Sequence, residues 1–202
     1  MARTPRVVED RREQIIDAAM RVFSQKGFSR ATNKDIAREA GITPGLIYHY
    51  FESKEALLKA MIEGRSPLRL LGSLPSQALM LPPEMFLRFL LLEVLNIVEE
   101  EKFVLLLRTM LPEMIHNPAM RPLATSVIQR ILAFLGSYFE TKMTSGELRQ
   151  LDLGLTTQAL LGSVMAFVLR RQIVHDPSAS QYTHEQIADA IIDTMLKGLL
   201  PR

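Results

Sequence analysis

The 202-residue sequence contains no cysteine and no tryptophan. The absence of cysteine excludes disulfides, thiolate metal sites and cysteine nucleophiles, and it fits a reducing compartment. Alternation of apolar and polar residues, which is typical of half-buried strands, is scarce. Because 48% of the residues are apolar and 23% are charged, the composition is that of a folded globular protein rather than a disordered one.

Sequence signatures of catalysis are also missing. The ten glycines are scattered and form neither a GxGxxG loop nor a P-loop, and no GxSxG or HExxH segment occurs. The four histidines, His49, His116, His175 and His184, lack the spacing of metal ligands. We therefore expect no enzyme activity, no cofactor and no metal site.

Targeting and membrane signals are weak. The N-terminus is polar and has no apolar signal-peptide region. One uncharged run, residues 153–169, reaches the short limit for a membrane span, but it contains Thr156, Thr157 and Ser163. We interpret it as a buried helix of a bundle and expect a soluble, cytoplasmic protein without a membrane partner.

The charge of the chain is nearly balanced, with 24 Lys and Arg residues against 22 Asp and Glu residues. Residues 1–65 hold 12 basic and 9 acidic residues, a net charge of +3, while residues 66–202 hold 12 and 13, a net charge of −1. This asymmetry is either chance or the sign of a basic face on an N-terminal nucleic-acid-binding unit.

Apolar residues recur every three to four positions along most of the chain, which predicts an all-α protein. Prolines and glycines concentrate in residues 66–83, which predicts a hinge with at most short helical pieces. The chain therefore divides into an N-terminal domain, residues 9–65, and a larger C-terminal domain, residues 66–202. The long helices of the second domain are predicted at residues 84–98, 101–116, 119–142, 148–173 and 183–200.

N-cap residues divide the N-terminal domain into short helices. Thr32, with Asp35 three residues later, has the spacing of a capping box, and Thr43 precedes a proline that suits the first helical turn. Ser53 is the N-cap candidate of one more helix. These caps predict three short helices after the first long one.

The window 33–50 fits a helix-turn-helix, in which two helices cross steeply across a tight turn. Ala37 permits close approach of the two backbones, and Gly41 tolerates a positive φ in the turn. An ordinary helical hairpin is the alternative interpretation of this window. The shared apolar face is predicted to consist of Ile36, Ala40, Ile42, Ile47 and Tyr50.

These segments resemble the TetR family of dimeric bacterial transcriptional regulators. The resemblance covers residues 9–62 and rests on TNKDIAREAGIT at 32–43, LIYHYF at 46–51 and SKEAL at 53–57. It implies an all-α homodimer whose N-terminal three-helix domain binds operator DNA and whose C-terminal domain binds a small-molecule effector. Beyond residue 62 the chain resembles the family only in length and helical pattern.

Ten residues are candidates for contact with operator DNA. Helix N-termini attract phosphates through free N–H groups and a partial positive charge. The resemblance implies a phosphate contact by Lys54 and groove contacts by Tyr48 and His49, for which a packed aromatic and a solvated histidine are the alternatives. The candidates are Thr32, Asn33, Lys34, Thr43, Pro44, Gly45, Leu46, Tyr48, His49 and Lys54.

The predicted recognition helix lacks the usual base-reading side chains. Between Thr43 and Tyr50 there is no Arg, Lys, Asn or Gln, the residues that read purines through paired hydrogen bonds. We therefore expect apolar contacts and DNA shape to provide specificity. An arm with Arg3 and Arg6 either assists from the minor groove or is a disordered tail.

The C-terminal domain contains candidates for two further roles. Large apolar side chains suit a pocket for an apolar effector, although the same residues at helical spacing also build plain core. The pocket candidates are Phe86, Phe89, Phe103, Leu107, Met110, Met114, Phe134, Tyr138 and Phe167. The resemblance implies that the last two long helices of each subunit form a bundle at the dimer interface, which we call the seam. Each seam candidate could instead face the core of its own subunit. The seam candidates are Gly154, Leu161, Gly162, Met165, Ala166, Ile187, Ile191 and Met195.

An effector-released repressor is the function that this organisation favours. About 120 residues of apolar helix follow the hinge, which is more than dimerisation needs. A DNA-binding dimer without an effector and a protein–protein module are the alternatives. Salt-dependent binding to DNA distinguishes a regulator from a protein–protein module.

Overall fold

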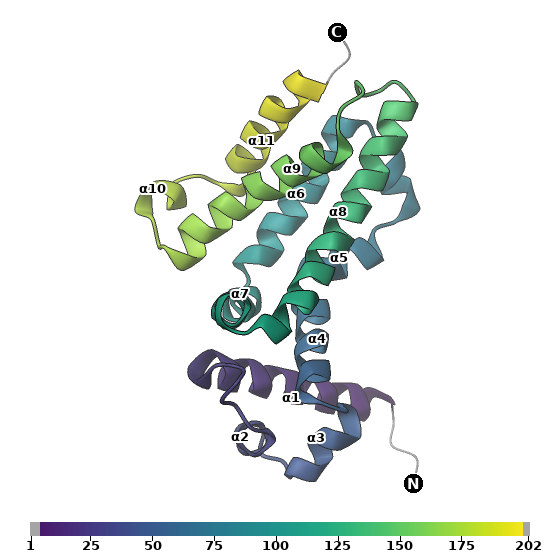
Figure 1. The fold of residues 1–202 in the computed structure, drawn as a ribbon. Helices are drawn as coiled ribbons and strands as arrows, with labels where there is room; N and C mark the ends of the chain where they lie inside the picture. The colour runs from purple at the N-terminus through teal and green to yellow at the C-terminus, as the bar shows by residue number, and fades with distance from the viewer. Residues whose placement is uncertain (1–4, 200–202) are drawn as a thin grey trace. The chain divides into compact units, whose positions relative to one another are not determined.

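The computed structural model describes residues 5–199, and all regular structure in this range is helical (Figure 1). The prediction of an all-α fold is thereby confirmed. Two compact units share the described chain. The first contains the residues up to Ser66 together with Glu101–Ala124, and the second contains Pro67–Glu100 together with the residues from Thr125 onward. The break at Ser66 coincides with the predicted hinge, but the sequence pattern does not indicate that residues 101–124 join the first unit.

The first unit is built around a long N-terminal helix, α1. Its buried face includes Ile15, Ile16, Ala19 and Phe23, and it packs against α2, α4 and α7. The helices of this unit are α1 (Pro5–Lys26), α2 (Asn33–Ala40), α3 (Pro44–Tyr50), α4 (Lys54–Arg65) and α7 (Glu101–His116), with a short 3-10 turn, η2 (Pro118–Met120).

Local capping defines the short helices of the first unit. Thr32 and Asp35 form a reciprocal capping box at the start of α2, and Ser53 Oγ accepts the N–H of Ala56 at the start of α4. Thr43 is the N-cap residue of α3, but its side chain makes no cap hydrogen bond. α2 ends at Gly41, whose φ of +63° is left-handed.

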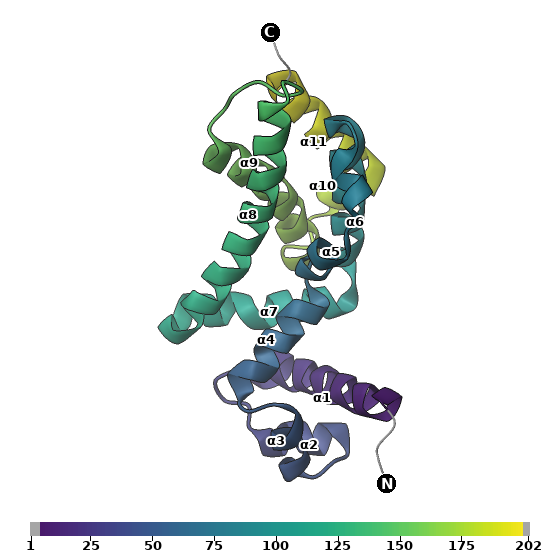
Figure 2. The ribbon, with the colours of Figure 1, turned by 90° about the vertical axis from the view of Figure 1, so that its right-hand side faces the viewer.

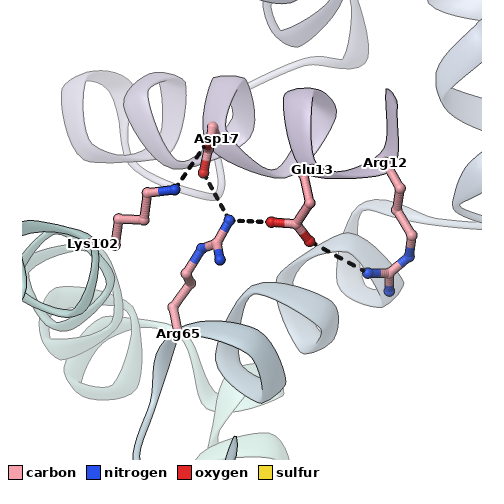
Figure 3. A network of polar contacts seen from close by, with 5 residues as sticks. All are labelled: Arg12, Glu13, Asp17, Arg65 and Lys102. Carbon is pink, nitrogen blue, oxygen red and sulfur yellow. Dashed lines mark hydrogen bonds and ion pairs between the residues drawn. The ribbon is translucent and has the colours of Figure 1, made fainter. Parts of the chain in front are cut away.

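A network of charges connects three helices of the first unit (Figure 3). Arg65 of α4 pairs with Glu13 and with Asp17 of α1, the latter at 3.0 Å. Lys102 of α7 contacts the same Asp17 carboxylate at 3.1 Å. Asp17 therefore lies between two cations from different helices, so α1 is tied to both α4 and α7.

The second unit is a bundle in which α6 packs against α9 and α11, and α9 also packs against α11 (Figures 1 and 2). Its core includes the buried side chains of Phe86, Leu90, Val164 and Ile187. Its elements are α5 (Leu68–Ser73), η1 (Ser76–Met80), α6 (Pro83–Glu99), α8 (Arg121–Thr144, from Thr125 onward), α9 (Leu153–Val168), the π-helical turn η3 (Leu169–Ile173), α10 (Pro177–Ser180) and α11 (His184–Leu199).

The predicted helix at 148–173 is shorter and ends differently in the structure. Asp152 caps α9, since its carboxylate accepts the N–H of Leu155 at 2.8 Å, so the helix begins at Leu153. At Leu169 the α-helical pattern gives way to the π-helical turn. Helical spacing alone shows neither the position of this cap nor the change of hydrogen-bond pattern.

The segment Leu153–Ile173 is long and apolar enough to cross a membrane by length and composition alone, with a mean hydropathy of 1.4 over its most apolar window. Within it, Thr156 and Thr157 are buried, and their hydroxyls donate to carbonyls one turn earlier. α9 packs against α6 and α11 within the second unit, and 28% of the apolar window is buried.

Polar contacts join α6 to the C-terminal elements of the second unit. Glu99 pairs with Arg171 of the π-helical turn at 2.8 Å and with the His184 ring at 2.8 Å. The other ring nitrogen of His184 lies 2.9 Å from the side-chain oxygen of Asn96. These contacts fix the end of α6 against the start of α11.

Candidate functional site

The α2–turn–α3 segment has the geometry of a helix-turn-helix. The N–H of Ile42 donates to the Ala37 carbonyl at 2.9 Å, which closes the turn after α2. Gln14 of α1 donates its side-chain amide to the Ala40 carbonyl at 2.7 Å. Of the predicted inner face, Ile36, Ala40 and Ile47 are buried. Ile42 and Tyr50 are only half-buried.

Most of the DNA-contact candidates lie on the surface of this segment. Asn33 and Leu46 are half-buried. The exposed candidates are Thr32, Lys34, Thr43, Pro44, Gly45, Tyr48 and His49. The segment therefore presents the first turn of α2 and the exposed face of α3 to solvent.

The aromatic residues at the end of α3 divide between surface and core. Tyr48 is 61% exposed, while Phe51 is only 5% exposed. The guanidinium of Arg12 lies over the Phe51 ring, 5.2 Å from its centroid. Tyr50 is half-buried and meets the His49 ring edge-on at 5.3 Å. Tyr48 is thus not a packed aromatic residue, and its ring is accessible to a partner.

Asp35 organises the start of α2 electrostatically. Lys26 Nζ contacts one of its oxygens at 2.6 Å, and the N–H and hydroxyl of Thr32 donate to the other. The hydrogen bond from Lys26, followed by those from Thr32, lowers the pKa of Asp35 from 3.8 to about 2. The capping box is therefore ionised at neutral pH.

Lys54, for which the resemblance implies a phosphate contact, is half-buried and hydrogen-bonded within the first unit. Its ammonium donates to the carbonyls of Phe28, Ser29 and Ala31 at 2.7, 3.4 and 3.1 Å. It also lies 4.5 Å from the centroid of the Phe28 ring. The ammonium thus contacts the turn before α2, and its contact with a DNA phosphate stays a prediction. No local sequence pattern indicates these hydrogen bonds of Lys54, because the acceptor carbonyls lie 23 to 26 residues earlier in the chain.

Glu113 of α7 is a polar residue that sequence reasoning missed. Its carboxylate accepts the N–H of Ser29 at 3.0 Å and the Ser29 hydroxyl at 2.8 Å. Burial raises its pKa, but the bonds from Ser29 and Asn117 and the charge of Lys54 outweigh burial and hold the pKa below its ordinary value. The 84-residue separation leaves no local sequence signal for this contact.

The effector candidates are divided between the two units. Phe103, Leu107, Met110 and Met114 lie on α7 in the first unit, where Phe103 and Met110 are buried. The candidates in the second unit are Phe86, Phe89, Phe134, Tyr138 and Phe167, of which Phe86 and Tyr138 are buried and Phe89 is exposed.

In the second unit Phe86 and Tyr138 stack with their ring centroids 4.0 Å apart. The Tyr138 hydroxyl is buried and has no hydrogen-bond partner among the described residues. Burial raises the pKa of Tyr138, and the charge of Glu147 adds to the effect. The phenol is therefore a neutral donor at physiological pH.

A hollow of about 460 Å³ lies elsewhere in the second unit, between α5 and α6. It contains no residue that the sequence singled out, and Arg69 and Glu100 pair at its edge. Its lining residues are Arg69, Leu70, Ser73, Glu93, Asn96, Ile97 and Glu100.

The dimer-seam candidates separate into exposed and buried positions. Gly154, Gly162 and Ala166 are exposed on α9. Ile187 and Ile191 of α11 are only 1% and 6% exposed within the single chain, which supports the core alternative for these two candidates. The half-buried candidates are Leu161, Met165 and Met195. Of the N-terminal arm, Arg3 lies outside the described residues, and the side chain of Arg6 is not described.

Two family models match the chain. Residues 15–61 match the model of bacterial regulatory proteins of the tetR family. Residues 85–198, more than half of the chain, match the C-terminal domain of AefR-like transcriptional repressors. The chain belongs to the TetR family. The resemblance inferred from residues 9–62 is thereby confirmed, and the second match extends it through the C-terminal domain.

Curated transcriptional regulators match about a quarter to a third of the chain. The transcriptional regulator HbdR of Aromatoleum sp. (strain CIB) is 50% identical over 54 residues, which are 27% of this chain and 24% of HbdR. BetI of Rhizobium meliloti (strain 1021) is 46% identical over 68 residues, 34% of this chain and 31% of BetI. The chain thus aligns with only 24% and 31% of the lengths of these two regulators.

Solved structures share the fold over nearly the whole chain. The fatty acid degradation regulator FadR from Bacillus halodurans has a TM-score of 0.75 at 24% identity and covers 100% of both chains. FadR from Bacillus subtilis, solved in complex with stearoyl-CoA, has a TM-score of 0.74 at 20% identity and covers 92% of this chain and 98% of its own. At these identities the similarity concerns the fold.

Proposed function

We propose that this chain is a DNA-binding transcriptional repressor that a small, largely apolar effector releases from its operator. The observation that carries the proposal is the solvent-exposed face formed by the first turn of α2 and by α3. This face lies on a capped helix-turn-helix whose inner side is packed against α1. The match to the C-terminal domain of transcriptional repressors supports repression as the sign of regulation.

The proposed operator contacts follow from the exposure of the candidate residues. Lys34 and the N-terminal amides of α2 suit phosphates, since both present positive charge. Pro44, Leu46 and Tyr48 suit apolar groove surfaces such as thymine methyl groups. The remaining proposed contacts are Thr32, Asn33, Thr43, Gly45, His49 and Lys54. Because α3 contains no Arg, Lys, Asn or Gln, DNA shape would contribute to specificity.

The proposed effector is apolar and bears a hydrogen-bond acceptor. In the second unit, the fully buried Phe86 ring stacks on Tyr138, whose buried hydroxyl has no partner among the described residues. The structural similarity to FadR of Bacillus subtilis, whose structure contains stearoyl-CoA, supports a ligand with a long apolar part. Phe103 and Met110 are also candidates for the effector pocket, but their side chains are buried in the first unit, where they can equally belong to its hydrophobic core.

The proposed active form is a cytoplasmic homodimer. Two-fold operators require two recognition helices about 34–36 Å apart, and a single short helix binds weakly. The exposed stripe of Gly154, Gly162 and Ala166 supports a seam on α9. An effector that binds one arrangement of the dimer more tightly than the other shifts the population between them, which couples ligand binding to DNA binding.

The test begins with selection of duplexes from a random-sequence pool by the purified full-length chain. We expect enriched half-sites with two-fold symmetry and an affinity that falls as salt rises. Stearoyl-CoA is then titrated with and without the selected duplex. Ligand and duplex should weaken each other's binding by the same factor.

Each result of this test supports one interpretation. If no duplex is enriched, the chain is not a sequence-specific DNA-binding regulator, and a role as a protein–protein interaction module is favoured. If stearoyl-CoA binds but leaves the duplex affinity unchanged, DNA binding stands and the effector switch fails for this ligand class.

A further inference from the structure

The C-terminal half of α8 buries two hydrogen-bond donors one helical turn apart. Tyr138 and Lys142 are each only 5% exposed, and their spacing of four residues places them on the same face of the helix. The Lys142 ammonium lies 5.8 Å from the centroid of the Tyr138 ring, which also stacks on the Phe86 ring. Buried donors normally have acceptors, so the partners of these two side chains indicate what the place can bind.

The two side chains have more donor hydrogens than acceptors around them. The Tyr138 hydroxyl is buried and has no partner among the described residues. A lysine ammonium has three N–H groups, but within the described part of the chain that of Lys142 bonds only to the two oxygens of Glu147, at 3.0 and 3.1 Å. Each side chain therefore keeps a donor hydrogen for a further acceptor. A buried donor that stays unpaired costs free energy, which an acceptor on a bound molecule would recover.

Glu147 is a partner that can give way to a competing anion. Its side chain is 40% exposed, whereas the Lys142 side chain is 6% exposed. Hydrogen bonds from Lys142 and Ser145 hold the pKa of Glu147 below its ordinary value, so the carboxylate is ionised at neutral pH. Because water reaches Glu147, the loss of its contact with Lys142 costs this carboxylate little. The ammonium itself stays buried and continues to require a negative partner.

An incompletely covered row of apolar side chains leads along α8 to these donors. Apolar residues lie four, seven and eleven positions before Tyr138, which is the repeat of one helix face. They are Phe134, Ile131 and Val127, and we call them the α8 track. All three are only half-buried, whereas Tyr138 at the end of the track is buried. The face from residue 127 to residue 138 is about 16 Å long at roughly 1.5 Å per residue, which suits an alkyl chain of medium length.

We propose that Tyr138 and Lys142 bind the carboxylate of an apolar carboxylic acid, whose apolar part lies along the α8 track. This inference rests on the proposed effector function and names the chemical class of the effector. A carboxylate has two acceptor oxygens, one for the phenol and one for the ammonium, and hydrogen bonds to an ionised acceptor are the strong ones. The acid competes with Glu147 for Lys142, and the ammonium offsets the cost of burying its charge.

Three probes with the same alkyl chain test the head group. Decanoate, 1-decanol and decanoyl-CoA are titrated into the full-length chain by calorimetry, each below its critical micelle concentration. Decanoate should bind about tenfold more tightly than 1-decanol, because only the carboxylate is a charged acceptor for the ammonium. Decanoyl-CoA should also bind more weakly than decanoate, since its thioester carbonyl is neutral and offers one oxygen in place of two.

Single-group variants test the two donors. Tyr138→Phe and Lys142→Met should each reduce the affinity for decanoate about tenfold, because each removes one charge-assisted hydrogen bond. Lys142→Met should leave the affinity for 1-decanol unchanged. Tyr182→Phe, at an exposed tyrosine, and Lys197→Met, which breaks an exposed 2.7 Å pair with Asp193, are the matched controls and should bind decanoate as wild type does.

Two further measurements separate binding from folding. Glu147→Gln removes the competitor for the ammonium, so decanoate should bind several-fold more tightly, whereas a purely structural role of Glu147 predicts no gain. Without ligand, Tyr138→Phe should melt at no lower temperature than wild type, because it removes a buried hydroxyl that has no partner among the described residues. Thermal unfolding followed by circular dichroism measures this temperature.

The outcomes decide the inference and the proposed function separately. Wild-type affinity for decanoate in Tyr138→Phe or Lys142→Met overturns the inference, as does absent decanoate binding or tighter binding of 1-decanol or decanoyl-CoA. A lower melting temperature of Tyr138→Phe without ligand also overturns it, because the hydroxyl would then be paired already, for example with a buried water. If decanoate binds through these residues but leaves the affinity for the selected duplex unchanged, the site stands and the proposed effector switch fails.

Discussion

At the scale of single residues, Asp35 shows how one carboxylate secures the start of a helix. It accepts hydrogen bonds from the backbone and side chain of Thr32 and pairs with Lys26. These contacts favour the ionised form, which is why its pKa falls from 3.8 to about 2. A lowered carboxylate pKa means that folding favours loss of the proton, so the stabilisation is present above about pH 3.8 and is lost as the pH falls toward 2.

Asp35→Asn should therefore reduce the free energy of unfolding at neutral pH, and the difference from wild type should shrink as the pH falls from about 4 to 2. Urea unfolding followed by circular dichroism at a series of pH values measures this difference. Asp10→Asn, at an exposed position of α1, is the control for loss of a carboxylate outside the cap. A difference that stays constant down to pH 2 would contradict the role of the ionised carboxylate.

At the scale of elements, α3 and α4 begin with hydroxyl residues that do different things. Ser53 caps the Ala56 N–H at 3.0 Å, while the Thr43 side chain makes no cap hydrogen bond. The start of α3 relies on Pro44, whose fixed φ suits the first helical position. The Thr43 hydroxyl is thus left available at the surface that we propose for DNA.

Ser53→Ala should cost about 1 kcal/mol of unfolding free energy, the usual value of a lost N-cap. Thr43→Ala, the matched variant one helix earlier, should lower the unfolding free energy by only a few tenths of a kcal/mol, because it removes no cap hydrogen bond. Urea denaturation of the two variants beside wild type measures both values. Equal losses in the two would mean that Thr43 contributes to α3 through a contact other than capping.

The same elements show what the sequence can predict. Caps such as Thr32, Gly41 and Ser53 act within a few residues, so their pattern locates helices α2 to α4 correctly. The partners of Lys54 and Glu113 lie 23 to 84 residues away and depend on how helices pack. Ile187 has the spacing of a seam residue and of a core residue, and only burial in the folded chain distinguishes the two.

At the scale of the whole molecule, the proposed dimer seam requires small residues on α9. Gly162 is exposed, and a Cβ added there meets nothing within 4 Å in the single chain. The single chain therefore has room for a larger side chain at position 162. Glycine in a helix interior lowers the stability of the helix by roughly 1 kcal/mol relative to good helix formers. The small residue suits close approach of another helix.

Gly162→Arg should leave the folded monomer at least as stable as wild type and weaken the dimer strongly. Light scattering after size exclusion, over a range of protein concentrations, measures the shift toward monomer. Gly64→Arg on α4 is the control, since its added Cβ also meets nothing within 4 Å. If Gly162→Arg remains as dimeric as wild type, the seam lies on another face.

The discontinuity of the first unit has a consequence for biosynthesis. Residues up to Ser66 are complete early, but α7 and the residues up to Ala124 belong to the same unit. At roughly 5–20 residues per second, the ribosome needs about 3 to 12 s to add this missing part. During that interval the nascent helix-turn-helix lacks Lys102 and Glu113, so Asp17 and Ser29 have yet to meet these partners. A chimera in which residues 1–66 alone are exchanged would lack these contacts of Lys102 and Glu113 permanently. A chimera that exchanges residues 101–124 together with residues 1–66 would retain them.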